Sequence, residues 1–447
     1  MTLNPTHALL WCAAALLGAS LSSTSAVAQT FFYTEVTNDG RIYVFAVSAT
    51  YDAFVNGGGA AIGSAIERPR YGPNGETVVF DSEEAINLYN YKHGLPGELF
   101  PKSEKPAEPK FPSSKISGLM FGDYYWFNQS HRDQVSSSDP TPVRELQGLW
   151  FRRLYFTYDF AFSERLSTRF RLEANSNGDF TGGEIVPYVK DAYLKWTYTH
   201  QQQLTLGIQP TLTFNWLEEF WGLRHIEKTP ADLYRLDSSR DFGFAFSGRS
   251  PIEGHSYAAQ FGNESGNGSE TREGKILRFE SRYERNPGIV LEGFYGFSTR
   301  AAGEHRHTAQ GIAGVRNAAA RVGAQYLWQN RTPGQDGVPN QEISVWSGFA
   351  VWERPNRADL FFRVDTVGGD LGGVETGLPG AEDIDYWLLS SQSRFTMWIV
   401  GAEWYLHPSV RLSPNLELVR YRKDPDPVNF PGRRQDSILR LTFFWTF

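Results

Sequence analysis

The sequence predicts an all-β protein, a 16-stranded antiparallel transmembrane β-barrel of the outer-membrane type, preceded by a small α+β module. Three observations carry this prediction. Apolar and polar residues alternate in short runs from residue 115 onwards, the links between these runs are long and short in turn, and the first residues have the pattern of an export signal. With 15% aromatic residues and a mean hydropathy of −0.41, the composition fits many strands better than membrane-spanning helices.

Residues 1–28 are predicted to be a signal peptide that is removed during export. The apolar run at 8–21 is too short to span a membrane, and Ala-Val-Ala at 26–28 is a small-x-small cleavage site. The single cysteine, Cys12, lies in this segment, so the mature protein is expected to have no thiol. A cysteine nucleophile, a thiolate metal site and disulfide bonds are thereby excluded.

Residues 29–94 are predicted to form a small periplasmic module of two β-turn-helix repeats. Residues 39–54 align with residues 74–89 at a shift of 35 positions, and each stretch has a turn, an apolar strand and a helical pattern. Asp81 is the expected N-cap of the second helix, and Gly94 is placed to end it. The two repeats are expected to pack together as one domain.

A Pro-rich linker over residues 95–114 precedes the predicted barrel domain, residues 115–447. Long and short connections must alternate when strands run up and down through a membrane with short periplasmic turns and longer outer loops. An even number of strands brings both ends of the domain to the periplasmic side. The predicted strands span residues 115–128, 148–162, 165–174, 187–199, 203–209, 241–249, 255–262, 275–285, 289–298, 307–315, 319–329, 341–352, 358–366, 394–405, 410–421 and 436–447.

One face of each predicted strand is apolar and the other face is polar or charged. Leu166, Phe170 and Leu172 share one parity, whereas Arg169 and Arg171 share the other. Burying so many charges inside a small soluble barrel would cost more free energy than placing them in water. The pattern therefore predicts a wide hydrated lumen and an outer face in lipid. No run of basic residues indicates a nucleic-acid partner.

Four stretches of the barrel domain carry a family resemblance. They read LWFRRL at 149–154, VKDAYL at 189–194, LGIQ at 206–209 and SRDFG at 239–243, and they are similar to the phosphate-selective porin O and P family. The resemblance implies a homotrimeric outer-membrane porin, through which small hydrophilic solutes diffuse and whose basic lumen side chains attract anions such as phosphate. The linker and the module lie outside that pattern and suggest a periplasmic partner of unknown kind.

The candidate pore-lining and anion-binding residues come from strand parity and from the long segment at 210–240. A ladder of guanidinium groups can pass phosphate along paired hydrogen bonds. Acidic residues such as Asp159 and Glu417 share the inward parity, so cross-strand salt bridges compete with anion binding. The candidates are Arg153, Arg169, Arg171, Lys195, Arg224, Lys228, Arg278, Arg282, Arg321, Arg363, Arg411 and Arg440.

The segment at 210–240 is the expected constriction of the pore. Asn215 is predicted to cap a short helix that carries Trp216 and Phe220 on one side, and Thr229-Pro230 is predicted to begin a second helix. Folded inward, the segment presents its basic residues to a solute. The alternative is an outward lid packed on its own aromatic rings.

No catalytic residue, cofactor or metal is predicted, and the protein is not expected to be an enzyme. The sequence has neither GxSxG nor HExxH, and the pair His305 and His307 is expected in a solvated loop. Two alternatives to a diffusion channel remain open at this point. One is an outer-membrane barrel enzyme acting on lipid or peptide, and the other is a plugged barrel with a structural or adhesive role.

Overall fold

The structure is a computed structural model, and it describes residues 32–59, 65–95, 110–135, 140–176, 184–212, 214–264, 266–268, 274–285, 288–300, 303–354, 358–381, 384 and 387–447. The expected signal peptide and most of the expected linker lie outside the described residues. The chain divides into two compact units, Met1–Lys110 and Phe111–Phe447, and each is described by itself. No helix in the described ranges has the length and apolar composition of a membrane span.

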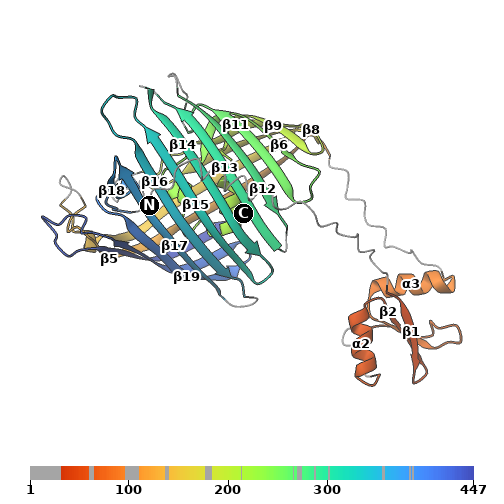
Figure 1. The fold of residues 1–447 in the computed structure, drawn as a ribbon. Coiled ribbons are helices and arrows are strands. Elements are labelled where there is room, and N and C mark those ends of the chain that lie inside the picture. Colours follow the sequence, from red (N-terminus) through yellow and green to blue (C-terminus); the bar gives the residue numbers. More distant parts are fainter. Residues whose placement is uncertain are drawn as a thin grey trace. The chain divides into compact units, whose positions relative to one another are not determined.

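The first unit contains one mixed sheet and two helices (Figure 1). The sheet has the order β1-β2-β4-β3, and its two central strands run parallel, each with an antiparallel partner at the edge. Each central strand leads directly into a helix, and the order is the same in both repeats. The elements are β1 (Thr34–Asn38), β2 (Arg41–Phe45), α2 (Ser48–Asn56), β3 (Ile66–Arg68), β4 (Thr77–Phe80) and α3 (Glu83–His93).

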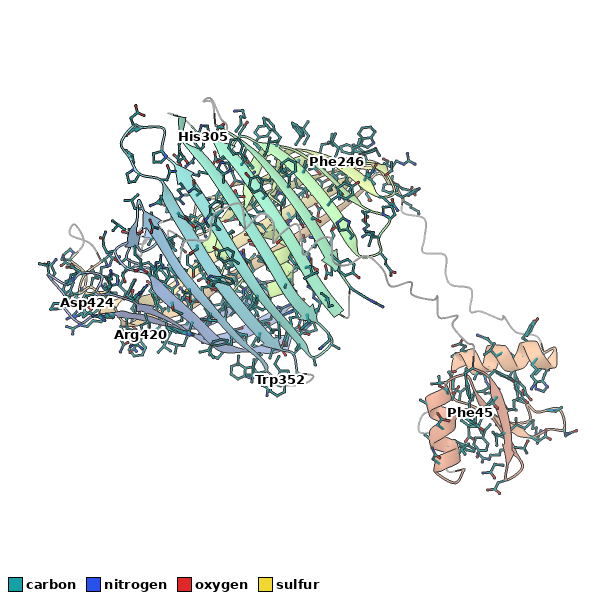
Figure 2. All side chains as sticks on the ribbon, viewed as in Figure 1. Phe45, Phe246, His305, Trp352, Arg420 and Asp424 are labelled. Atoms are coloured by element: carbon teal, nitrogen blue, oxygen red, sulfur yellow. The ribbon has the colours of Figure 1, made fainter. Side chains whose placement is uncertain are left out.

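The two helices cover opposite faces of this sheet. Helix α3 places Tyr89 edge-on against Phe80, with ring centroids 5.5 Å apart. Helix α2 places Phe54 against Phe45, which points to the other face, with centroids 5.2 Å apart. Figure 2 labels Phe45 within the side chains of this unit. Because both faces are covered, the unit buries a hydrophobic core of its own.

The edge strands β1 and β3 go beyond the predicted repeats. Strand β1 joins β2 through a two-residue turn, in which Asp39 and Gly40 have positive φ angles of 46° and 73°. Such angles match a tight hairpin turn to the twist of its strands, and Asp-Gly is a favoured sequence for it. The Asp-Gly pair therefore forms the turn of a hairpin between β1 and β2, whereas the predicted repeat had only the strand that follows the turn.

The caps of α3 correct one prediction. Its N-cap is Ser82, whose hydroxyl accepts a backbone N–H of the first turn. Asp81 instead accepts the backbone N–H groups of Ala46 and Val47, just before α2, and so links the two repeats. Gly94 ends the helix with a left-handed φ of 63°, as predicted.

The second unit is a closed barrel of 16 long antiparallel strands, and a short strand, β18 (Val374–Thr376), extends a hairpin from β17. The predicted fold class and all the predicted strands are confirmed, with bounds that shift by a few residues. The last strand pairs with the first and closes the barrel. The long strands are β5 (Ser113–Gln129), β6 (Gln147–Ala161), β7 (Leu166–Ala174), β8 (Tyr188–Thr199), β9 (Gln202–Pro210), β10 (Arg240–Arg249), β11 (His255–Gly262), β12 (Lys275–Glu284), β13 (Gly288–Thr299), β14 (His305–Arg316), β15 (Ala320–Thr332), β16 (Gln341–Trp352), β17 (Asp359–Leu371), β19 (Phe395–His407), β20 (Val410–Tyr421) and β21 (Gln435–Thr446).

The connections give the barrel two different ends. Short links such as 162–165, 200–201 and 408–409 all lie at one end, here called the turn end. Long links such as 211–239 and 372–394 start from the opposite end, here called the loop end. This is the alternation expected of strands that cross a membrane.

The outward face of the barrel is apolar. Figure 2 shows Trp352 projecting outside the wall at the turn end of β16. Alternate residues in contact with lipid, with aromatic rings near the strand ends, are the arrangement of a transmembrane barrel. In β6 the outward positions are Leu149, Phe151, Leu154, Phe156, Tyr158 and Phe160.

Bulges at two places bring adjacent residues to the inside. Arg152 is the extra residue in the register of β6 against β5, so Arg152 and Arg153 both face inward. Lys190 is the extra residue of β8 against β7. Beyond the first bulge Trp150 also faces inward and donates its indole N–H to Asp123 at 3.0 Å. Trp150 is therefore turned away from the lipid.

Candidate pore and its inward segment

The segment between β9 and β10, residues 211–239, lies inside the barrel. It contains α4 (Phe214–Trp221) and α5 (Pro230–Leu233), and most of its described side chains are buried against inward-facing residues of the wall. The structure thus selects the inward alternative for this segment. Helix α5 begins after Thr229 with proline in its first position, as predicted, whereas Asn215 lies inside α4 and does not cap it.

A buried cluster of charges holds the middle of the segment against the wall. The Oε2 atom of Glu227 lies 3.2 Å from Nη1 of Arg440 and 3.7 Å from Nη1 of Arg152. Asp123 is 2.8 Å from the Arg152 guanidinium, and Glu417 is 2.5 Å from that of Arg440. All five side chains are at most 3% exposed. Each charge therefore depends on its partners for the solvation that water would otherwise supply.

Wall side chains also donate hydrogen bonds to the backbone of the segment. Arg152 donates to one of its carbonyl groups at 2.7 Å, and Arg363 donates to the Lys228 carbonyl at 2.5 Å. Further along, Gln329 donates to the Leu236 carbonyl at 2.5 Å. Carbonyl groups that are removed from water need such partners. Strands β6, β15 and β17 together fix the path of the segment.

A second segment, between β17 and β19, fills the loop end of the lumen on one side. Leu378, Trp387 and Leu389 are almost fully buried there, in one cluster with inward-facing side chains of the wall. The expectation of a wet inner face all round the barrel is wrong for this part, because its inner face is a packed core. The inward apolar side chains are Leu327, Ile343, Val345, Val351, Val367, Met397, Ile399, Val419 and Ile438.

The turn end of the barrel is hollow. Cavities of about 270, 480 and 780 Å³ open there. Helix α4 lies between the two larger ones, since Asn215 lines both, Trp216 lines the cavity of 480 Å³, and Glu218 lines that of 780 Å³. The basic side chains that line the three cavities are Lys115, Arg169, Arg171, Lys195, Arg224, Arg240, Arg249, Arg282, Arg321 and Arg411. The acidic ones are Asp159, Glu218, Glu219, Glu280, Asp359 and Glu403.

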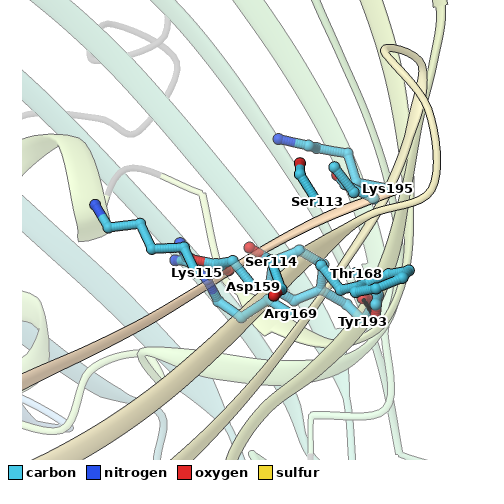
Figure 3. Close-up of a pocket in the computed structure, with 11 residues that line it drawn as sticks. Ser113, Ser114, Lys115, Asp159, Thr168, Arg169, Tyr193 and Lys195 are labelled. Atoms are coloured by element: carbon cyan, nitrogen blue, oxygen red, sulfur yellow. Dashed lines mark hydrogen bonds and ion pairs between the residues drawn. The ribbon is translucent and has the colours of Figure 1, made fainter. Parts of the chain in front are cut away.

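Seven of the candidate residues lie in the linings of these cavities. In the smallest cavity Arg169 pairs with Asp159 at 2.6 Å, whereas Lys195 has no carboxylate within 4.0 Å among the described residues. Figure 3 shows Lys115 and Lys195 extending from the wall beside the Asp159–Arg169 pair. The other six, all arginines, each contact a carboxylate: Arg169, Arg171, Arg224, Arg282, Arg321 and Arg411.

Five candidate residues are buried away from the three cavities. Arg278 is fully buried and contacts Asp237 at 2.6 Å and Asp241 at 2.8 Å. Through Asp237, which belongs to the inward segment, Arg278 ties that segment to β12. Arg363 and Arg440 also join the wall to the segment, whereas Arg153 pairs with Glu173 of β7 and Lys228 belongs to the segment and lies near its Asp232. The five are Arg153, Lys228, Arg278, Arg363 and Arg440.

The residue list drawn from the sequence omitted four basic side chains of this region, Lys115, Arg152, Arg240 and Arg249. Lys115 lines two cavities, and its parity along β5 was a usable signal, because Asp123 on the same strand also faces inward. Arg240, at the start of β10, lines the largest cavity. Arg152 was hidden by the bulge in β6, which no alternation of apolar and polar residues reveals.

The histidine pair of the sequence lies in a strand. His305 and His307 lie at the start of β14 and not in a loop, and the hydrogen-bond partner of His307 is Tyr295, at 2.7 Å. Within the described ranges no group of three or more His, Cys, Asp or Glu side chains is arranged to hold a metal ion. What the cavities offer chemically is a hydrated surface with both signs of charge and an excess of cations.

The fold is that of outer-membrane porins. The chain is similar to OmpT of Vibrio cholerae, with 9% identity and a TM-score of 0.51 over 76% of this chain and 99% of that one. It is also similar to an anion-selective porin from Comamonas acidovorans, with 11% identity and a TM-score of 0.54 over 75% of this chain and all of that one. A third similar structure is Salmonella typhi OmpF in complex with daunomycin, with 11% identity, a TM-score of 0.52 and coverage of 75% and 98%. No family model and no curated protein matches the sequence.

Proposed function

We propose that the chain is an outer-membrane porin for passive diffusion of small hydrophilic solutes, with a preference for anions such as phosphate. The barrel spans the outer membrane, its turn end faces the periplasm, and the N-terminal unit lies in the periplasm. The apolar outward face supports this placement, since a soluble protein does not surround itself with such a band. A channel of this kind needs no cofactor and no catalytic residue.

The observation that carries the anion preference is the charge of the cavity walls. The three cavities at the turn end are lined by ten basic and six acidic side chains. The whole chain has the opposite balance, 43 basic and 50 acidic residues, which gives a net charge of −7. Basic side chains are therefore concentrated in the hollow part of the lumen. Such a surface attracts anions and raises their local concentration.

A homotrimer is part of the proposal. A structure of similar fold, OmpT of Vibrio cholerae folded in vitro, is described as a trimer form. The outward aromatic and aliphatic band offers each subunit a surface for lipid and for its neighbours. Chemical cross-linking of outer membranes should give a ladder that ends at three subunits. A ladder that ends at one subunit would contradict this part of the proposal.

Planar-bilayer recordings of the purified full-length protein test the channel directly. Stable ohmic steps are expected, and in a salt gradient the reversal potential should have the sign of an anion-preferring pore. A reversal potential of the opposite sign would contradict the anion preference but leave the pore intact. Measurable hydrolysis of lipid or peptide by non-conducting barrels would favour a barrel enzyme instead.

A plugged structural barrel is the second candidate, and the packing of the lumen favours it. The described residues of 211–239 contact several sides of the wall, and those between β17 and β19 fill one side of the loop end. A barrel sealed in this way should be silent in bilayers although it is fully folded. Heat-modifiable migration in gels gives the folded fraction that this comparison requires.

A further inference from the structure

Helix α4 docks on the wall through an aromatic ring that enters a glycine-lined recess. Phe220 is fully buried and lies in one cluster with Val290 and Ile312. Gly314 of β14 and Gly323 of β15 are cross-strand partners, and the ring lies over this pair. We call Gly314 and Gly323 the glycine socket.

The socket has no room for a larger side chain while the ring is in place. A Cβ atom on Gly323 would lie 2.9 Å from Cε1 of Phe220 and 2.6 Å from Cε1 of Phe349. A Cβ atom on Gly314 would lie 2.5 Å from the carbonyl oxygen of Val322 and 2.6 Å from Cζ of Phe220. Real Cβ atoms do not come so close to ring carbons, because the repulsion is steep at these distances. Glycine at both positions therefore leaves room for the Phe220 ring beside the wall, in a space that Phe349 and the Val322 carbonyl group also limit.

Further contacts hold the same face of α4. Trp216 stacks on Phe220 with an interplanar angle of 15°, and Arg316 lies over the Phe220 ring at 5.4 Å. Glu284 of β12 accepts the Trp216 indole N–H at 2.9 Å and pairs with Arg316 at 3.0 Å. Arg282 lies over the Trp216 ring at 5.1 Å. The helix is thus clamped to β12, β14 and β15, and a displacement at the socket moves it as a unit.

The position of α4 matters because the helix lies between the two larger cavities. Asn215 lines both of them, and Glu218, Glu219 and Gly222 line the larger one. We propose that Phe220 and the glycine socket are positioning residues that fix α4 against the wall and so set the cross-section of the pore. The proposal rests on the proposed diffusion function and specifies which contacts determine its size limit.

The first test compares Phe220→Ala with the wild type in bilayers and in proteoliposomes. Loss of the ring leaves space between α4 and the wall, so conductance should rise by about twofold, as if a second passage had opened beside the first. The largest sugar that enters the vesicles should also increase in size. A merely structural role would lower the yield of folded barrel and leave the conductance of each folded channel unchanged.

The second test compares Gly323 of the socket with Gly311, an outward-facing glycine of β14 that serves as the control. Gly323→Ala should push α4 into the lumen and lower the conductance. Gly311→Ala adds the same methyl group to β14, but on the outward face, where nothing lies within 4 Å, and should leave the conductance unchanged. Equal conductance of both variants and the wild type, in fully folded barrels, would overturn the proposal.

A swap variant tests the fit of ring and socket in the reverse direction. Phe220→Ala combined with Gly323→Leu pushes the Phe349 ring, which contacts Phe220 in the wild type, toward the vacated space and so refills it from the wall. The conductance should then return toward the wild-type value. The double variant staying as open as Phe220→Ala would count against the socket. A variant that does not fold is recognised by its loss of heat-modifiable migration, and the other two variants then decide.

Cross-linking separates this proposal from the failure of channel activity itself. The only cysteine of the sequence is Cys12, so cysteines introduced at 220 and 323 in the mature chain react alone. A short bifunctional methanethiosulfonate should join them in intact outer membranes, whether or not the wild type conducts. A wild type that is silent while the cross-link forms would refute diffusion and support the docking of α4. Absence of the cross-link would refute the docking.

Discussion

Two parts of the barrel wall share the same outward face and differ inside. From β15 to β21 the inner face at the loop end is apolar and packs against residues from the two inward segments. Around β6 to β8, β10 and β12 the inner face is charged, as with Arg153 and Glu173, which lie 2.7 Å apart. The difference teaches that the alternation of side chains along a strand determines which of them point inward, but not whether the lumen beside them is hydrated. Hydration depends on whether an inward chain segment packs against that part of the wall.

The two parts also hold their segments by different forces. The apolar part is stabilised by the removal of side chains from water. This contribution depends little on the exact orientation of the side chains. The charged part relies on buried ion pairs, which are close to neutral when complete but costly when one partner is removed. The charged part should therefore be the more sensitive to single substitutions.

The largest effect is expected for Arg278→Ala on the charged part. It leaves Asp237 and Asp241 buried without their shared partner, and the free energy of unfolding should fall by about 3–5 kcal/mol. Urea unfolding of the protein in lipid vesicles measures this change. Arg249→Ala, at an exposed position at the turn end, is the control and should stay within about 0.5 kcal/mol of the wild type. Equal losses for both variants would mean that the charged part is not held by its ion pairs.

On the apolar part, Met397→Ala should lower the free energy of unfolding by about 2–5 kcal/mol. The side chain is fully buried in the cluster with Trp387 and Leu389, so its removal leaves a cavity. Val400→Ala on the same strand, which faces outward, should cost less because lipid fills the space. A larger loss at Val400 would reverse the assignment of inside and outside on β19.

Ion selectivity gives a third comparison, between paired and unpaired cations of the charged part. Lys195→Glu should shift the reversal potential toward cations more than Arg169→Glu does. The reason is that a carboxyl group at position 169 would lie beside Asp159, where two like charges disfavour each other's ionisation, whereas Lys195 has no carboxylate within 4.0 Å among the described residues. Charge reversal at Arg169 and Arg171 together should also lower anion permeability. Unchanged selectivity in all of these variants would remove them from the pore lining.

Acid should weaken the N-terminal unit slightly. Burial alone raises the pKa of Glu35, but hydrogen bonds from Tyr33, His93 and Lys92 outweigh it and hold the pKa below its usual value. A carboxyl with a lowered pKa in the folded state stabilises the fold above its unfolded pKa, near about 4.3, and this contribution is lost as the pH falls through the lowered value. Glu35→Gln should reduce the loss of unfolding free energy between neutral pH and pH 3, by less than about 1 kcal/mol. Hydrogen exchange of the unit between neutral pH and pH 3 can detect such a change.

The smallest effect is expected from removing the unit altogether. Deletion of residues 30–110 should leave the conductance of the barrel unchanged, because the unit has its own core and its own sheet. Loss of channel activity in folded protein would show that the unit belongs to the pore.

The sequence was sufficient for the strands and insufficient for the lumen. Parity along each strand predicted all the long strands, because lipid imposes one rule on every outward position. The inward segment was recognised from Trp216 and Phe220, which are spaced as on one face of a helix, and from the proline at the start of the second helix. The position of the segment against the wall was not predictable, since the ion-pair partners of Glu227 and Asp237 lie on strands that are distant in the sequence. Arg152 was missed for a physical reason, because a bulge shifts parity without leaving a mark in composition.

Solute uptake into proteoliposomes tests the account most directly. Vesicles that contain the folded full-length protein should swell in isotonic solutions of small sugars, with rates that fall as the sugar grows, and should admit phosphate faster than a cation of similar size. Folded barrels that admit no solute at any size would contradict a diffusion pore and leave a sealed barrel as the function of this fold.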